Sequence, residues 1–323
     1  MESTNEYQPE LTASIDVSRN ERADELSNRR IVLHGLLFIA TAATVTLTGA
    51  TSALSANVDS AFRPYKIIFS AAAVGDFSPL VPGFVFAFTL LTCLAAHEFG
   101  HYFACRHYRI RATLPFFIPA PPMTPFGTFG AVIRIKEPIT TRRALFDIGI
   151  AGPLAGFVLA LPAALIGLFI AQADSPPADE HFMTFNDPLL FILIQQVFKL
   201  PKFIKWNPVY FAAWATMLVT ALNLFPVGQL DGGHVVYALF GPKLHKWISR
   251  ITFVCVAVLS VASFVIHGSP VWFLWTAVLL FLLRMGHPPT YMEQPLGKVR
   301  VALAILAAIA FLLAFMPFPI TIS

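Results

Sequence analysis

The chain has 323 residues, of which 56% are hydrophobic and 12% charged, and its formal net charge is +4. Soluble globular domains carry roughly twice that share of charged residues, so an ordinary soluble protein is excluded. No basic cluster suggests a nucleic-acid partner. Together with a mean hydropathy of +0.68, these values predict a polytopic protein embedded in a lipid bilayer.

The N-terminal residues 1–30 are polar and rich in both acids and bases, which fits neither a signal peptide nor a transit peptide. We expect a mobile tail there, and one membrane-embedded domain over 31–323 with its core at 80–240. Because arginines precede the first apolar segment, the positive-inside rule places the N-terminus in the cytoplasm.

The rest of the chain is dominated by apolar segments near the length that crosses a bilayer. We expect an all-α polytopic membrane protein with about seven transmembrane helices. The last spans are short, so six or eight crossings stay open. The expected spans are 31–54, 80–105, 144–171, 207–239, 251–266, 271–283 and 301–317.

A strongly basic loop joins the second and third spans, and its charge places it in the cytoplasm. Its part 114–125 is rich in proline, which excludes a regular helix. Residues 127–135 carry the β-branched and aromatic side chains of a strand or hairpin. Such apolar irregular backbone is expected to lie against the membrane domain, as a small membrane-associated β-hairpin.

The second span contains the pattern H-E-x-x-H, formed by His97, Glu98 and His101. Residues four apart share one face of a helix, so both imidazoles can bind one zinc ion while Glu98 serves as general base and acid. The pattern alone is a moderate signal, because many histidines only satisfy core hydrogen bonds. Glu98, however, is the sole acid in 77–136, and a carboxylate at membrane depth is costly, which favours a metal site.

A catalytic zinc ion needs a third protein ligand, and Asp231 is the candidate. It is the sole acid in 206–240. The charge pattern makes both the second and the fourth span run inward, so both acids lie in the cytoplasmic part of their spans. The alternative that Asp231 caps a helix starting at Gly232 stays open.

These residues carry a resemblance to the site-2 protease family of intramembrane zinc metalloproteases. The H-E-x-x-H pattern is followed by Asn-x-x-Pro-x-x-x-Leu-Asp-Gly at 223–232, and Gly-Pro-Leu-Ala-Gly at 152–156 is also similar. The resemblance covers roughly 91–240. It is greatest to the branch without an inserted PDZ domain, and we detect no insertion of that size.

The resemblance implies one Zn²⁺ per chain, bound by His97, His101 and Asp231, with Glu98 as the catalytic residue. The implied partner is a membrane-anchored protein substrate, cut in or near its transmembrane segment. Asn223 matches a residue that orients substrate or the oxyanion. Its alternative role is to satisfy backbone groups freed by Pro226.

An extended substrate is expected to add to the edge of the predicted strand, at Gly127, Phe129 and Gly130. Two rival functions stay open. One is a metal or proton transporter, and the other is a catalytically inactive membrane scaffold. Since no organelle-targeting segment is visible, we expect a bacterial plasma membrane, with the active site toward the cytoplasm.

Other polar residues receive weaker assignments. His234 is a candidate for supporting a zinc ligand or for capping a helix and is not assigned to the zinc ion, and His287 has no partner pattern. Asp147 is expected to cap a helix or to pair with Arg142 or Arg143.

Overall fold

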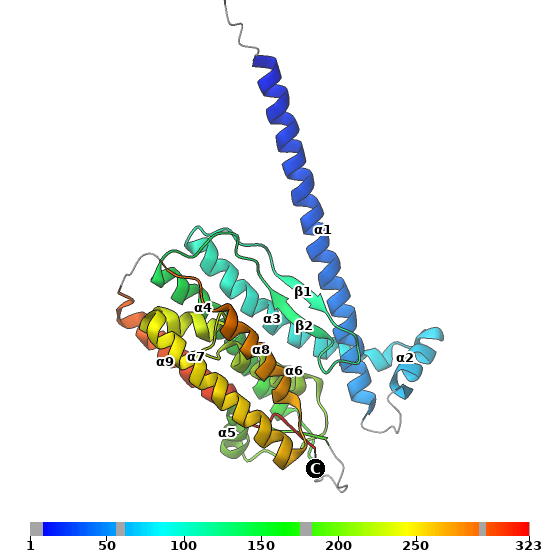
Figure 1. The fold of residues 1–323 in the computed structure, drawn as a ribbon. Coiled ribbons are helices and arrows are strands. Elements are labelled where there is room, and N and C mark those ends of the chain that lie inside the picture. The colour runs from blue at the N-terminus through cyan, green and yellow to red at the C-terminus, as the bar shows by residue number, and fades with distance from the viewer. Residues whose placement is uncertain (1–8, 56–61, 175–182, 291–294, 323) are drawn as a thin grey trace, which may run out of the picture.

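The computed structural model describes residues 9–55, 62–174, 183–290 and 295–322, and for residues 9–30, 183 and 322 it describes the backbone alone. Helix α1, Pro9–Ser55, includes most of the stretch predicted to be a tail. It projects beyond the other elements (Figure 1). The division into tail and membrane domain stays a prediction.

Helices make up most of the described chain. Among the described residues, five helical segments are long and apolar enough to cross a membrane, and three apolar helices are shorter, at Leu189–Phe198, Pro208–Asn223 and Val271–Met285. The prediction of an all-α polytopic membrane protein is therefore confirmed, with an approximate span count. The helices after α1 are α2 Arg63–Ala73, the 3₁₀ turn η1 Ser78–Leu80, α3 Val81–His107, α4 Arg142–Phe169, α5 Leu189–Phe198, α6 Pro208–Asn223, α7 Asp231–His267, α8 Val271–Met285 and α9 Gly297–Ala314.

Helix α4 lies at the centre, where it packs against α3, α6, α7 and α9. Small residues allow close approach: a Cβ on Gly100 of α3 would stand 2.5 Å from the Ala151 carbonyl oxygen of α4. Trp214 of α6 is fully buried and stacks on Phe211 with ring centroids 5.7 Å apart. Large apolar side chains cover the outside, as lipid contact requires, and Phe88 is 77% exposed.

The predicted fourth span is broken where Asn223 and Pro226 suggested. Helix α6 ends at Asn223, a turn follows in which Gly228 has φ 56°, and α7 begins at Asp231. Helix α7 is itself kinked at Gly241 (φ 78°, ψ 176°), which is followed by Pro242. The segment 231–240 before the kink is therefore a short helix of its own.

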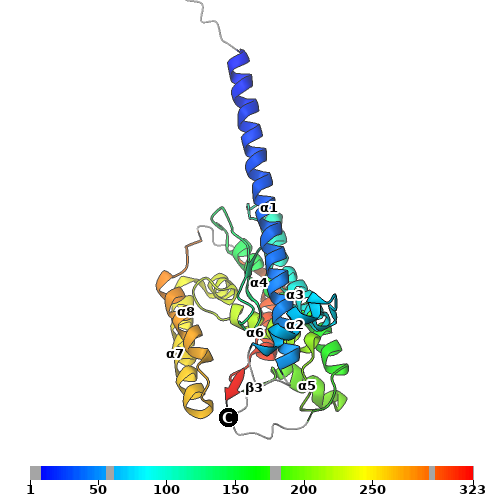
Figure 2. The same ribbon diagram turned by 90° about the vertical axis from the view of Figure 1, so that its right-hand side faces the viewer.

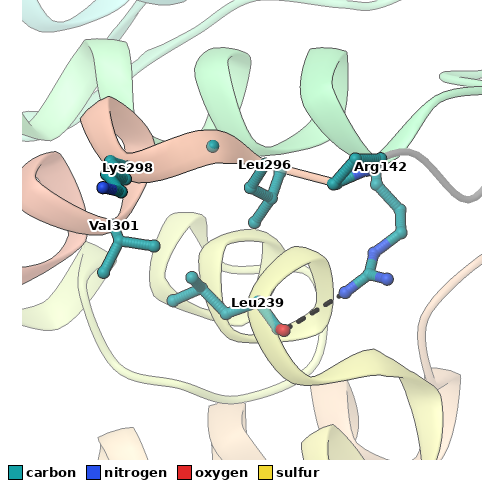
Figure 3. A pocket seen from close by; sticks show the side chains of 7 residues that line it. Arg142, Leu239, Leu296, Lys298 and Val301 are labelled. Carbon is teal, nitrogen blue, oxygen red and sulfur yellow. Dashed lines mark hydrogen bonds between the residues drawn. The ribbon is translucent and has the colours of Figure 1, made fainter.

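Arg142, in the first turn of α4, holds the end of that short helix. Its guanidinium donates to the carbonyl oxygens of Ala238 at 2.6 Å and Leu239 at 3.1 Å. The residue four positions after Ala238 is Pro242, which has no N–H to donate, so a cation is an expected cap at this kink. Figure 3 shows Arg142 reaching Leu239 across a pocket whose other wall is the start of α9, with Leu296 and Lys298.

A small β-hairpin is confirmed, with its second strand inside the predicted stretch 127–135 and its first strand inside the proline-rich stretch 114–125. Strands β1, Phe116–Pro119, and β2, Thr128–Val132, pair antiparallel, and they lie beside α1 (Figure 1). Hydrogen bonds fasten the hairpin to α1: Thr44 Oγ1 donates to the Gly127 carbonyl at 2.7 Å, and His34 Nδ1 lies 3.0 Å from the Pro115 carbonyl.

A second two-stranded sheet, β3 Met183–Phe185 with β4 Ile320–Ile322, joins the C-terminal segment to the loop before α5. Figure 2 shows β3 at the end of the molecule remote from the projecting end of α1.

Asp147 differs from the expectation. Its carboxylate pairs with Arg300 of α9, Nη2 to Oδ2 2.6 Å, and accepts from the Tyr108 hydroxyl. Arg142 is engaged by α7, and Arg143 donates to the Pro295 carbonyl at 2.9 Å. Arg142 and Arg143, the basic residues expected to pair with Asp147, thus bind backbone carbonyls instead.

Candidate metal centre

Helix α3 supplies the first two candidate ligands. His97 and His101 lie one turn apart, and their side chains are buried against α4 and α7. Their Nε2 atoms are 3.1 Å apart, and the rings meet at 72°. Two imidazoles on one helix face thus point their nitrogens at a common position.

Asp231 completes the group from the start of α7. Its Oδ2 lies 3.3 Å from His97 Nε2 and 3.4 Å from His101 Nε2. Ligand atoms about 2.0–2.1 Å from a tetrahedral zinc ion stand about 3.3–3.4 Å from one another. The three atoms therefore occupy three corners of such a tetrahedron, and the fit to zinc rests on this spacing and on the imidazole and carboxylate donors.

Neighbouring groups orient these ligands. His101 Nδ1 donates to the Ile148 carbonyl at 2.7 Å, which leaves Nε2 with its lone pair toward the centre. The position of Asp231 does not support a capping role, because Leu230 holds the N-cap position and no side-chain capping bond forms there. Asp231 instead directs its carboxylate to the imidazoles.

Glycines of α4 make room for the rings. A Cβ on Gly152 would collide with the His101 imidazole, and one on Gly156 would stand 3.2 Å from His97 Cβ. Gly149, one turn earlier, admits the first turn of α7, since its Cβ would stand 2.8 Å from His234 Cβ. The spacing of these glycines matches that of the histidines, so the two helices fit at the metal centre.

Glu98 lies beside the three ligands, buried, on the same turn of α3. Its carboxyl is close enough to interact electrostatically with His101, with Asp231 and with the backbone of Ile133. Ile133 directly follows β2, so the hairpin reaches the centre at this point. A carboxylate here can take a proton from water and return it to a leaving group.

Comparison with known proteins agrees with this geometry. The model of Peptidase family M50 matches residues 85–266, which include all of the residues above. The chain belongs to peptidase family M50. This is the site-2 protease family, so the family resemblance noted in the sequence is confirmed.

Two relatives of this M50 chain are plant proteins. The "Probable zinc metalloprotease EGY2, chloroplastic" of Arabidopsis thaliana is 32% identical over 232 residues, which cover 70% of the chain and 40% of the relative. The "Probable zinc metalloprotease EGY1, chloroplastic" of the same organism is 28% identical over 240 residues, 72% of the chain and 42% of the relative. The chain thus spans about two fifths of these relatives.

Among solved structures, the Site-2 Protease from Methanocaldococcus jannaschii matches with a TM-score of 0.37 and 15% sequence identity. The match covers 72% of this chain and 91% of that one.

Asn223 lies where the M50 resemblance placed it, next to the metal centre. It is the last residue of α6, and its Nδ2 is 3.3 Å from His97 Nε2. An amide at this distance can donate to a substrate oxygen close to the ligands. Its role in orienting substrate stays a prediction.

Gly127, Phe129 and Gly130, the residues predicted to pair with a substrate strand, differ in whether their backbone groups are free to do so. The Gly127 carbonyl already accepts from Thr44 and from the Ala120 backbone, and its N–H donates to Thr124. Gly130 exchanges hydrogen bonds with the Thr128 hydroxyl. Phe129 is 68% exposed. Within the described residues β1 is the only strand paired with β2, so the other edge of β2 has no strand partner.

Sequence reasoning missed one feature near the M50 centre. His234 Nδ1 lies 2.8 Å from Nε2 of His287, a residue in the loop after α8. The position of His234, three residues after Asp231, indicated that its side chain could support a zinc ligand. Nothing in the sequence indicated that His287 is its partner.

Proposed function

We propose that this M50 chain is an intramembrane zinc metalloprotease. It hydrolyses peptide bonds in or near transmembrane segments of membrane-anchored proteins. The observation that supports this most is the convergence of His97 Nε2, His101 Nε2 and Asp231 Oδ2 within 3.1–3.4 Å of one another inside apolar helices, with Glu98 adjacent. A buried acid-and-histidine group of this kind, which is costly at membrane depth, is explained by a bound ion.

Each residue has a distinct task in this proposal. His97, His101 and Asp231 would hold one Zn²⁺, which activates a water molecule and polarises the scissile carbonyl. Glu98 accepts the proton of the attacking water and delivers it to the amide nitrogen that leaves. Asn223 donates its amide N–H to the carbonyl oxygen as negative charge develops there.

A substrate must be extended at the cleaved bond, because a helix hides its carbonyls in its own hydrogen bonds. The unpaired edge of β2 offers an extended template that ends at Ile133, beside Glu98. Because Gly127 and Gly130 are engaged within the hairpin, Phe129 and Ala131 are the positions at which pairing is proposed.

Proline at Phe129 or Ala131 tests this template. The substitution removes a backbone donor, so cleavage should fall while zinc binding stays intact. Proline at Met123, an exposed position in the turn between the strands, is the matched control and should leave cleavage unchanged. Full activity with proline at both strand positions would contradict a role for the edge.

The chain is a multi-pass membrane protein, and its proposed site is the bacterial plasma membrane. The basic loop between α3 and α4 supports an N-terminus and active site on the cytoplasmic side. Accessibility of cysteines introduced at Lys136 and Lys243 to an impermeant thiol reagent tests this orientation, since both should react only from the cytoplasmic side.

The experiment that tests catalysis is Glu98→Gln in the full chain, reconstituted in lipid. Removing the general base should lower cleavage of single-span substrates at least about 10²-fold, while zinc content stays the same. Comparison of membrane proteomes with the active and Glu98→Gln forms then identifies substrates. A transporter would show metal or proton flux that changes with Glu98→Gln and no cleavage, and a scaffold would show neither.

A further inference from the structure

A second group of histidines lies beside the proposed zinc centre. His234 is in the first turn of α7, His245 follows the kink at Gly241, and His287 is in the loop after α8. His245 is buried and the other two are partly buried. They belong to three segments that meet only in the folded chain.

The ring geometry of this group resembles that of the His97–His101 pair. Ring centroids are 4.9 Å apart for His234 and His287, with planes at 80°, and 5.3 Å apart for His245 and His287, with planes at 71°. The corresponding values for His97 and His101 are 4.8 Å and 72°. The ring spacings are thus similar to that of the His97–His101 pair. The ligand atoms of all three rings do not yet converge, since among the described residues only those of His97, His101 and Asp231 lie within 4.8 Å of one another.

The surroundings prepare His287 as a ligand. Its Nδ1 donates to the Pro288 carbonyl at 2.7 Å, which leaves the Nε2 lone pair toward His234. His101 forms the same kind of hydrogen bond with the Ile148 carbonyl, and a metal-bound histidine is usually oriented by such a bond from its other ring nitrogen. Tyr237 stacks on the other face, at 4.0 Å between centroids, and fixes the ring plane.

We propose that His234, His245 and His287 form a second site, which binds a divalent transition metal such as Zn²⁺. Three neutral imidazoles are a donor set that suits zinc, with a fourth position left for water. The inference does not depend on peptide hydrolysis, because it concerns binding alone. It adds a second ion to the one held by His97, His101 and Asp231.

Binding requires two small changes. The proton that His234 Nδ1 shares with His287 Nε2 moves to His234 Nε2, so the two nitrogens can separate from 2.8 Å to the roughly 3.3 Å of a tetrahedral zinc site. His245, whose Nε2 now lies 3.4 Å from Ser249 Oγ, turns toward His287. An ion held in this way links both halves of α7 to the loop after α8.

The test counts zinc ions per chain. The full chain, purified in detergent without a polyhistidine tag, is dialysed against buffered Zn²⁺ and analysed by atomic emission. We expect two zinc ions per wild-type chain, one in His287→Gln and one in His245→Gln. His107→Gln, at an exposed histidine outside both groups, is the matched control and should keep two.

Removing the ligands of the first centre distinguishes zinc bound there from zinc bound at the second site. A His97→Ala/His101→Ala chain should keep one zinc ion, and adding His287→Gln should remove it. Circular dichroism and gel filtration verify that each variant is folded, and His287→Gln retains a hydrogen-bonding side chain of similar reach. One zinc ion in the wild-type chain, or a second ion that persists in the His245→Gln/His287→Gln chain, would overturn the proposal.

Discussion

The two histidine groups differ in charge as well as in position. The group of α3 and α7 includes Asp231, so a zinc ion there would leave a net charge of about +1, whereas three neutral imidazoles leave +2 on a bound ion. Excess positive charge in a poorly solvated site is costly. We therefore expect the centre with the carboxylate to retain its metal and the second group to release it more readily. A buried carboxylate distinguishes a resident ion from an exchangeable one.

Gly152→Ala is expected to have the largest effect, and to affect the two histidine groups differently. The added methyl group would occupy the space of the His101 imidazole, so the first centre should lose its zinc ion and all cleavage while the second group keeps its ion. Zinc analysis and a cleavage assay measure both. Gly35→Ala, at a helical glycine with nothing within 4 Å, is the matched control. A wild-type zinc content in the Gly152→Ala chain would contradict this, because it would mean that α3 and α4 move apart at little cost in free energy.

Asn223→Ala is expected to have the next largest effect. Loss of a donor to the developing oxyanion should lower kcat by about 10²–10³ while zinc content and folding stay the same. If Asn223 instead forms hydrogen bonds with backbone groups left unpaired near Pro226, the variant should lose thermal stability and its zinc ion along with activity. The ratio of kcat to zinc content separates these outcomes.

Arg142→Ala should have a smaller effect, on the half-helix that carries both Asp231 and His234. Removing the cap on the Ala238 and Leu239 carbonyls should destabilise the protein by about 1–3 kcal/mol and weaken zinc binding at both centres together. Arg143→Ala loses one exposed hydrogen bond and should change the melting temperature less. Equal shifts in the two variants would show that the kink needs no cap.

Acidification should leave His287 unchanged over the range in which free imidazole titrates. Burial among His234, His245 and Tyr237 lowers the pKa of His287 to about 4, so the neutral ring persists as the pH falls from 7 to 5.5. A free histidine, with a pKa of about 6.5, would be mostly protonated at the lower pH. NMR of histidine-labelled, zinc-free protein, assigned with His287→Gln, measures this, and titration near 6.5 would contradict it.

The two groups also differ in what the sequence could predict. His97 and His101 are four residues apart on one helix, so their shared face follows from helical geometry. Asp231 was found because it is an isolated acid at the same membrane depth as Glu98. The pairing of His234 with His287 depends on how α8 returns to α7, and no local pattern encodes that. The same holds for Asp147, whose partner Arg300 is 153 residues away.

The attachment of the hairpin to α1 has a consequence for how a substrate would be received. The side chains of His34, Thr44 and Thr48 form hydrogen bonds with the segment around β1 and β2, so the hairpin is attached to α1 at three points. Helix α1 contributes none of the proposed zinc ligands, yet we expect a tilt of α1 to move the exposed strand edge relative to them. If the chain is the protease proposed above, we expect admission of a polypeptide to depend on this helix at the periphery of the bundle.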